Sequence, residues 1–183
     1  MLISFTKDYF YQKGFSVLEV MLAFSVITVG LLGVSSLAIQ NAQVQSISKN
    51  YLVASMLAQE GLELVRNVRD TNFFRADQSY DWEYGQGANS ATDIVQDGNY
   101  AIDYNLAIDS MPNDLTSDRT RLYLNGGRYT HQTGAGSSNT PYRRLIFVTD
   151  HNPDYVEVRV AISWSERGRT HNYEAVTNLY NWW

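Results

Sequence analysis

The sequence contains no cysteine and only three prolines among its 183 residues. The absence of cysteine excludes disulfide bonds, thiolate metal sites and thiol nucleophiles. It does not decide the compartment, because an exported protein can do without disulfides. Basic residues are outnumbered, with 14 Lys and Arg against 19 Asp and Glu, for a net charge of -5. Nucleic acid is therefore not expected as a main partner, since phosphate binding needs a basic surface.

Motifs of the common enzyme classes are also missing. The sequence has no G-x-S-x-G elbow, P-loop, H-E-x-x-H or dinucleotide-binding fingerprint. The three histidines, His131, His151 and His171, are predicted to have ordinary surface or partly buried roles. The adjacent Arg143 and Arg144 are predicted to lie on a solvated strand face. We therefore expect no cofactor and no enzymatic activity.

One short segment carries a weak metal signal. Asp150, Asn152 and Asp154 alternate oxygen-bearing side chains, which is how a loop wraps calcium. An EF-hand would also need Gly at the sixth position and Glu at the twelfth, where this chain has Tyr155 and Ala161. A turn between two strands is the preferred interpretation. Calcium stays the weaker one.

The N-terminal region contains a long apolar run. From Phe15 to Ile39 the chain has 25 residues with one charge, Glu19. As a helix this run would be about 37 Å long, which is enough to cross a hydrocarbon core of about 30 Å. Lys7 and Lys13 precede the run, and lysines there keep that end cytoplasmic. The bulk of the chain is therefore expected outside the membrane.

The helical pattern continues beyond the apolar run. Small and apolar residues recur at alternating spacings of three and four, which indicates an amphipathic helix. They are Val44, Ile47, Tyr51, Ala54, Ala58, Gly61, Val65 and Val68, widened by Leu57 and Leu64. No proline interrupts Phe15 to Arg69, so the sequence predicts one helix of 55 residues. One face of its second half needs a globular partner.

Three interpretations compete for the apolar run. It is an ordinary signal anchor, a signal peptide cut at the small-residue site Ser36-Leu37-Ala38, or a helix preceded by a leader that is removed. Glu19 bears on the choice, because a carboxylate in an apolar run is unfavourable by a few kcal/mol near the bilayer centre and by less towards an end. In the first helical turns it suits the helix dipole, and it could simply reach the headgroups. The uninterrupted helix disfavours the signal peptide.

The start of the apolar run, Lys13-Gly14-Phe15-Ser16-Val17-Leu18-Glu19-Val20, resembles the prepilin processing motif of type IV pilins and pseudopilins. That motif joins a basic leader ending in Gly to a Phe that becomes the new N-terminus and a Glu shortly after it. The continuation to Gly33 is similar to the minor pilin and pseudopilin branch. Residues 58–66 resemble the family's amphipathic half-helix. The leader, at 14 residues, is longer than many.

The resemblance implies specific roles. Prepilin peptidase would cut the Gly14–Phe15 bond, and the new amine of Phe15 would be methylated. Glu19 would pair with the Phe15 ammonium of a neighbouring subunit as the apolar helices bundle. A buried carboxylate beside a buried ammonium is far less unfavourable than either group alone. The implied partners are prepilin peptidase, other pilin or pseudopilin subunits and, before assembly, the membrane.

The rest of the chain is predicted to be rich in strands and loops. Residues 76–98 and 133–141 have loop compositions. Predicted strands, from alternation or short apolar runs, cover 99–108, 121–124 and 128–131 around an Asn125-Gly126-Gly127 turn, 145–148, 156–164 and 170 to about 180. A mostly antiparallel sheet packed on the amphipathic half of the helix follows, which is an α+β fold. We expect a leader at 1–14, a transmembrane half-helix at 15–39, an amphipathic half-helix at 40–70 and a β-rich headpiece at 71–183.

These features favour a structural subunit, a minor pilin or pseudopilin of a type IV pilus, competence or type II secretion filament. It would first be a single-pass protein of the cytoplasmic membrane with its C-terminal headpiece outside. It would then enter an extracellular or periplasmic filament. The alternative is a membrane-anchored or secreted ligand-binding domain with an ordinary signal sequence. Its 13 Tyr, 7 Phe and 4 Trp would then serve an aromatic-rich binding sheet.

Overall fold

The computed structural model describes residues 14–74, 97–152 and 155–180; for 72–74 and 150–152 it describes the backbone alone. By its internal contacts the chain divides into two compact units, Met1–Ile47 and Ser48–Trp183. We call them the N-terminal unit and the globular unit and describe each by itself. The helix α1 (Val17–Phe74) contributes residues to both.

Helix α1 confirms the prediction of a single long helix and extends it at the C-terminal end. It has 58 residues and ends at Phe74, five residues after the predicted end. No proline or glycine lies in the added turn. Polar side chains near this end interact with one another. Arg69 Nη2 lies 2.8 Å from Asp70 Oδ1, and Thr71 Oγ1 donates to Asn67 Oδ1 at 3.1 Å. These local bonds stabilise a turn whose composition alone reads as the beginning of a loop.

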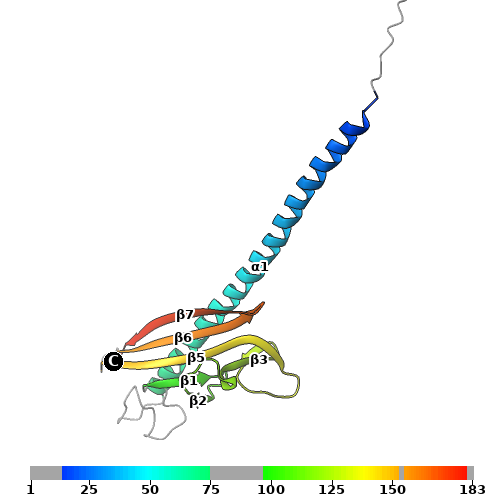
Figure 1. Ribbon diagram of the computed structural model, residues 1–183. Helices are drawn as coiled ribbons and strands as arrows, with labels where there is room; N and C mark the ends of the chain where they lie inside the picture. The colour runs from blue at the N-terminus through cyan, green and yellow to red at the C-terminus, as the bar shows by residue number, and fades with distance from the viewer. Residues whose placement is uncertain (1–13, 75–96, 153–154, 181–183) are drawn as a thin grey trace, which may run out of the picture. The chain divides into compact units, whose positions relative to one another are not determined.

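The described residues of the globular unit form seven strands in one sheet, and every neighbouring pair is antiparallel (Figure 1). Its longest strand, β5, pairs with β6 along one edge and with β1 and β3 along the other. Strand β2 pairs with β1, β4 with β3, and β7 with β6. The elements are β1 (Gly98–Ile102), β2 (Ile108–Ser110), the 3-10 helix η1 (Asp118–Thr120), β3 (Arg121–Asn125), β4 (Arg128–Thr130), β5 (Ser138–Asn152), β6 (Tyr155–Glu166) and β7 (Arg169–Tyr180). The predicted α+β fold is confirmed.

Four of the predicted strands agree closely with the structure. The hairpin β3–β4 turns at Gly126 and Gly127, whose φ angles of 56° and 81° lie in the left-handed region that glycine tolerates. Both central residues with positive φ define a type I′ turn, which matches the twist of the strands. Strands β6 and β7 also cover the predicted ranges.

The prediction of one strand over 99–108 is wrong. The segment is a hairpin in which Tyr100 pairs with Ser110 and Ile102 with Ile108. The turn closes because Leu106 N donates to Asp103 O at 2.8 Å, and Asn105 Oδ1 accepts from Ala107 N at 3.1 Å. Asp and Asn favour such turns through side-chain bonds of this kind. The alternating apolar residues concealed the turn.

Strand β5 is much longer than the predicted strand 145–148. It has 15 residues and includes 138–141, which were predicted to belong to a loop. The polar composition of 138–141 suggested a loop, but its backbone pairs with β3, where Leu124 lies opposite Ser138. Pairing with β3 overrides the weak local strand preference of these residues.

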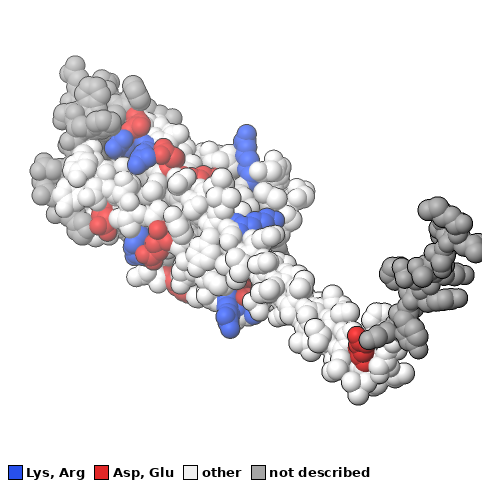
Figure 2. Space-filling view, turned by 90° about the horizontal axis from the view of Figure 1, so that it is seen from above, with Lys and Arg blue, Asp and Glu red and all other residues white. Residues whose placement is uncertain are grey.

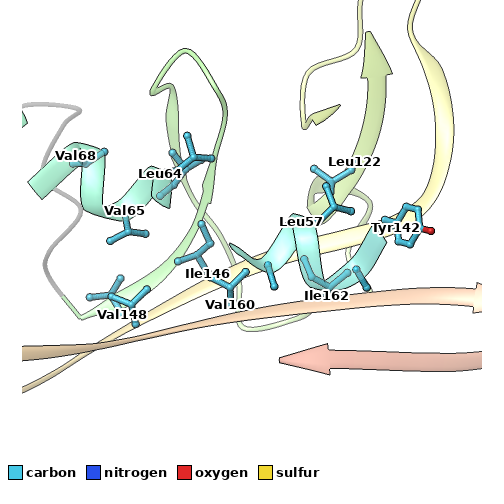
Figure 3. Packing of buried hydrophobic residues seen from close by; sticks show 14 of the residues in the cluster. Leu57, Leu64, Val65, Val68, Leu122, Tyr142, Ile146, Val148, Val160 and Ile162 are labelled. Atoms are coloured by element: carbon cyan, nitrogen blue, oxygen red, sulfur yellow. The ribbon is translucent and has the colours of Figure 1, made fainter. Parts of the chain in front are cut away.

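The core of the globular unit lies between α1 and one face of the sheet (Figure 3). The buried side chains of α1 are spaced three and four residues apart and meet alternate residues of β5 and β6. From α1 they are Ala54, Leu57, Ala58, Leu64, Val65 and Val68; from the two strands they include Ile146, Val148, Val158, Val160 and Ile162. Each large aliphatic side chain stabilises the fold by about 1.5–3 kcal/mol on full burial. The predicted amphipathic stripe is thus covered from Ala54 onward, whereas Val44 and Ile47 are exposed.

Candidate functional site at the start of the apolar helix

The predicted processing junction lies where irregular backbone becomes helix. Residues 14–16 are outside regular secondary structure, and α1 begins at Val17. The first turn closes when Val20 N donates to Ser16 O at 3.2 Å. Gly14, Phe15 and Ser16 are all exposed. An exposed, non-helical Gly14–Phe15 bond is the form of backbone that a peptidase active site can take up.

Gly14 has no structural role among the described atoms. A Cβ added to it would meet nothing within 4 Å, and its φ does not fall in the range that disfavours other residues. Neither packing nor backbone conformation therefore requires glycine here. A requirement for glycine at this position would come from a partner that binds this backbone.

The helix of the N-terminal unit exposes apolar side chains all round. Leu18 is 68% exposed, Met21 70% and Val29 70%. Its polar residues are largely satisfied internally, because Ser25 Oγ donates to Leu22 O at 2.8 Å and Thr28 Oγ1 donates to Phe24 O at 2.7 Å. This stretch of α1 is long and apolar enough to cross a membrane. An exposed surface of this composition is stable only in lipid or against other apolar helices.

Glu19 is the exception in this surface. It lies in the first turn of α1 and has no hydrogen-bond or ion-pair partner among the described residues. Figure 2 shows the described part of the apolar helix as white apart from one red patch, in agreement with the sequence, where Glu19 is the only charged residue from 14 to 48. The helix dipole favours a negative charge at this end. The carboxylate nevertheless lacks a counter-charge among the described residues of its own unit.

Phe15 and Glu19 border the same shallow groove on the helix. It is lined by two rows of side chains spaced four residues apart, Phe15, Glu19, Ala23 and Ile27 in one, Val20 and Phe24 in the other. The small side chain of Ala23 leaves the space between the rows. The groove is apolar except at the carboxylate. It can therefore take an apolar group that carries a positive charge at one end.

The weak calcium candidate stays untested. The backbone of Asp150 and Asn152 belongs to the end of β5, but their side chains and all of Asp154 lie outside the described residues. Among the residues that the structure describes, no group of three or more potential metal ligands comes together. Residues 76–96 of the predicted loop 76–98 also lie outside the described residues.

The prediction of a solvated Arg144 is wrong. Its side chain is fully buried on the helix-facing side of β5, whereas Arg143 is partly exposed. Arg144 Nη1 lies 3.4 Å from Glu60 Oε2 of α1, and Nη2 donates to Ile102 O of β1 at 2.9 Å. Burial lowers the pKa of the guanidinium, and the neighbouring carboxylates of Glu60 and Asp103 oppose that shift. The sequence concealed this role because Leu145 and Phe147, on the opposite face, are apolar too.

Asp103 and His131 form a second buried polar pair that the sequence did not indicate. Asp103 Oδ1 lies 2.9 Å from His131 Nδ1 and accepts from the His131 backbone N at 2.8 Å, while Oδ2 accepts from Thr130 Oγ1 at 3.0 Å. Burial acts to raise the pKa of Asp103, but these hydrogen bonds and the nearby imidazole outweigh it, so the pKa is lowered. The pair ties the end of β1 to the end of β4. His131 Nε2 lies 3.4 Å from Arg144 O, which links the pair to β5.

Comparison with known proteins gives one match. The family model of the prokaryotic N-terminal methylation motif matches residues 9–35. The match spans the Gly14–Phe15 bond, Glu19 and most of the apolar run. No curated protein and no solved structure matches the chain significantly.

The matched motif, the long N-terminal apolar helix and the β-sheet globular unit are together consistent with a type IV pilin-like protein. Proteins with this motif are substrates of the prepilin type, with structural roles. The motif implies processing by prepilin peptidase and assembly with other pilin subunits. An apolar N-terminal helix of this length is consistent with a membrane anchor.

Proposed function

We propose that this chain is a minor pilin or pseudopilin, a non-enzymatic subunit of a type IV pilus, competence or type II secretion filament. Prepilin peptidase removes residues 1–14 by cutting the Gly14–Phe15 bond, and the amine of Phe15 is then methylated. Residues 15–39 hold the subunit in the cytoplasmic membrane, with the globular unit outside. On assembly the same residues leave the lipid and enter the helical core of an extracellular or periplasmic filament.

The observation that carries the proposal is Glu19, which has no partner among the described residues and is the one charge from residue 14 to 48, on a helix that exposes apolar side chains. Lipid alone satisfies the apolar side chains but not the carboxylate. A bundle of identical or related processed subunits satisfies both, because each brings its own N-terminal ammonium on Phe15. Only one axial offset between two helices joins the ammonium of one to the carboxylate of the other. Glu19 then sets the register of the bundle.

Gly30 and Gly33 support close packing in such a bundle. A Cβ on either would meet nothing within 4 Å, so neither glycine serves the described packing of its own chain. Small residues on apolar helices let neighbouring backbones approach closely. In an assembly of helices these positions gain contacts that a lone subunit does not make.

The sequence of the mature N-terminus tests the proposal. Mass spectrometry of the membrane-embedded protein from its host should find a chain that begins with N-methylated Phe15. Gly14→Val should block the cut and leave the precursor in the membrane. A mature chain that begins at Ile39 would show ordinary signal peptidase processing and would favour a secreted ligand-binding domain instead.

A further inference from the structure

Most arginines of the globular unit have a carboxylate partner. The pairs are Arg66–Glu63, Arg69–Asp70, Arg121–Asp118, Arg143–Asp118, Arg144–Glu60 and Arg159–Glu174. Five exposed cations have no such partner in the described part of the chain: Lys49, Arg119, Arg128, Arg167 and Arg169. Arg119 lies apart on η1, but the other four are not scattered over the unit.

Three of the four cations are linked by contacts between α1 and the β6–β7 turn. Asn50, next to Lys49, donates from Nδ2 to Glu166 Oε2 at 2.9 Å. Glu166 lies opposite Arg169 in the backbone register of the two strands, and Arg167 occupies the turn between them. Tyr51 packs edge-on against Trp164 at 4.9 Å, which fixes the base of the turn to the helix. The turn and the first residues of α1 in this unit therefore lie at the same end.

Strand register brings Arg128 to that end as well. Tyr142 of β5 lies opposite Trp164 of β6, so Ser138, four residues earlier, extends to about the level of the β6–β7 turn. Ser138 pairs with Leu124, one residue before the β3–β4 turn that leads to Arg128. We call Lys49, Arg128, Arg167 and Arg169 the basic end of the globular unit.

Acidic residues are scarce around the basic end. The sequence has no Asp or Glu from residue 20 to 59, nor from 119 to 149. Glu166 is the carboxylate that the contacts above place there. Four cations against one carboxylate make this end positive in a protein whose net charge is -5. The field at this end is opposite in sign to that of the whole chain.

Arg167 adds a conformational argument. Its φ of 52° lies in the left-handed region, where asparagine and glycine are the preferred residues of such a turn. A residue with a side chain is held there against its ordinary backbone preference. The turn therefore presents a cation at its tip although a residue better suited to the backbone would fold at least as well.

Direction relates the basic end to the apolar run. Strand β6 runs antiparallel to α1, because Val160 faces Gly61 and Trp164 faces Tyr51. The turn after Glu166 is therefore at the end of the unit from which α1 leads back towards Ile39. Only nine residues, 40–48, separate Ile39 from Lys49 in the chain. Long basic side chains can reach lipid headgroups from positions just outside an apolar span.

We propose that the basic end binds anionic phospholipid headgroups while the subunit is still anchored in the membrane. This inference rests on the proposed function, since it needs residues 15–39 to span a bilayer. Basic residues next to a membrane span are attracted to anionic lipid, an effect of about fivefold in the binding equilibrium for each residue, and the attraction falls off within a Debye length of about 8 Å. Headgroup binding holds the globular unit at the surface until filament assembly removes it.

A single fluorescent label can measure this contact, because the chain has no native cysteine. The full chain carrying Ser165→Cys, an exposed position beside the turn, is labelled and inserted into nanodiscs that contain a headgroup-attached quencher. Quenching is compared between phosphatidylcholine discs and discs that also contain phosphatidylglycerol. We expect stronger quenching in the anionic discs, reduced by high salt. A label at Asn178→Cys, about 30 Å along β7 from Arg169, should show little difference.

Variants that remove charge from the basic end test whether its cations cause the lipid-dependent quenching. Arg167→Ala/Arg169→Ala should remove most of the lipid-dependent quenching, about twenty-fold in the docking equilibrium. Arg119→Ala, an exposed cation on η1, is the matched control and should leave it unchanged. Equal quenching in both kinds of disc, from a chain that is inserted in both, would overturn the headgroup proposal alone. Failure of the chain to insert in either disc would overturn the proposed membrane anchoring with it.

Discussion

Gly61 of α1 and Val160 of β6 approach so closely that no side chain fits between them. A Cβ added to Gly61 would lie 2.8 Å from Val160 Cγ1 and 3.1 Å from Val160 Cγ2. Both distances are shorter than normal contacts, and the β-branched side chain of Val160 is fully buried and has little freedom to turn away. The glycine thus sets how near the helix comes to the sheet.

Gly61→Ala should destabilise the globular unit. Alanine gains about 1 kcal/mol in helix propensity, but overpacking a full core costs about 1–3 kcal/mol, so a net loss on the order of 1 kcal/mol is expected in urea denaturation. In a Val160→Ala background the same change should have no cost, because the clashing methyl groups are gone. Gly134→Ala is the control, since its added Cβ would meet its nearest neighbour, Asn125 Nδ2, at an ordinary 3.5 Å. Additive effects of the two core changes would contradict the clash.

A chain that begins at Gln40 should fold as a soluble monomer. The buried side chains of α1 begin at Ala54, so the truncation removes no part of the core. Circular dichroism should show helix and sheet together, with a cooperative thermal transition. A disordered spectrum would mean that the apolar run is needed for folding. The oligomeric state should be measured by sedimentation, because the side chains of Leu52 and Met56 on α1 are 57% and 59% exposed and offer an apolar surface for self-association.

The ion pair of Arg144 and Glu60 should respond unequally to loss of its two partners. Glu60→Ala leaves a fully buried guanidinium without its carboxylate and should destabilise the unit by several kcal/mol, up to about 3–5. Arg144→Met should be close to neutral or stabilising, because a flexible apolar side chain fills the space and the carboxylate of Glu60 can reach water. The double variant Glu60→Ala/Arg144→Met should resemble Arg144→Met alone. Equal losses from the two single variants in urea denaturation would contradict this account.

Asp103 should make the globular unit sensitive to acid. Its pKa is lowered in the folded state, so the folded state binds fewer protons than the unfolded state near the ordinary aspartate pKa. The stabilisation is therefore fully present above an ordinary pKa of about 3.9 and is lost as the pH falls through the lower folded value. Asp103→Asn should lower the free energy of unfolding at neutral pH and lose less of it on acidification below about pH 4. Asp109→Asn, at an exposed position of β2, is the control. Parallel pH profiles for wild type and Asp103→Asn would rule out the role.

Glu19 should matter for assembly and not for folding. Glu19→Ala should leave membrane insertion intact, because it removes a polar group from the bilayer, and should leave the unfolding of the globular unit unchanged. Incorporation into filaments should fall sharply, since a buried ammonium loses its counter-charge at a cost of about 3–5 kcal/mol. Glu19→Asp keeps the charge with a shorter reach and should be intermediate. Full complementation of a null mutant by Glu19→Ala would rule out the pairing.

The sequence predicted those parts of the fold that depend on local periodicity. Continuous apolar character and the absence of proline predicted α1, and Asn125-Gly126-Gly127 predicted its turn. The extent of β5 was not predictable from residues 138–141, because their strand state comes from pairing with β3. The turn at Asp103 was concealed by apolar residues that alternate on both sides of it.

The functional and buried polar residues also fall into those that the sequence indicated and those that it did not. Gly14, Phe15 and Glu19 form a short motif that is visible in the sequence, and their roles stay predictions. The burial of Arg144 and the pairing of His131 with Asp103 were missed because both depend on how distant parts of the chain come together. Their partners, Glu60 and Asp103, are 84 and 28 residues away from them in the chain.

The antiparallel course of β6 along α1 has a mechanical consequence for a subunit in a filament under tension. A pull along α1 loads its contact with the sheet in shear, parallel to the strands. The side chains from Ala54 to Val68 must then slide past those of β5 and β6 together, because none can leave its place alone. The close contact of Gly61 with Val160 and the ion pair of Arg144 with Glu60 also resist sliding of the helix along the sheet. Such a joint resists a pull along the helix far better than one directed across it, which would peel the contacts apart one turn at a time.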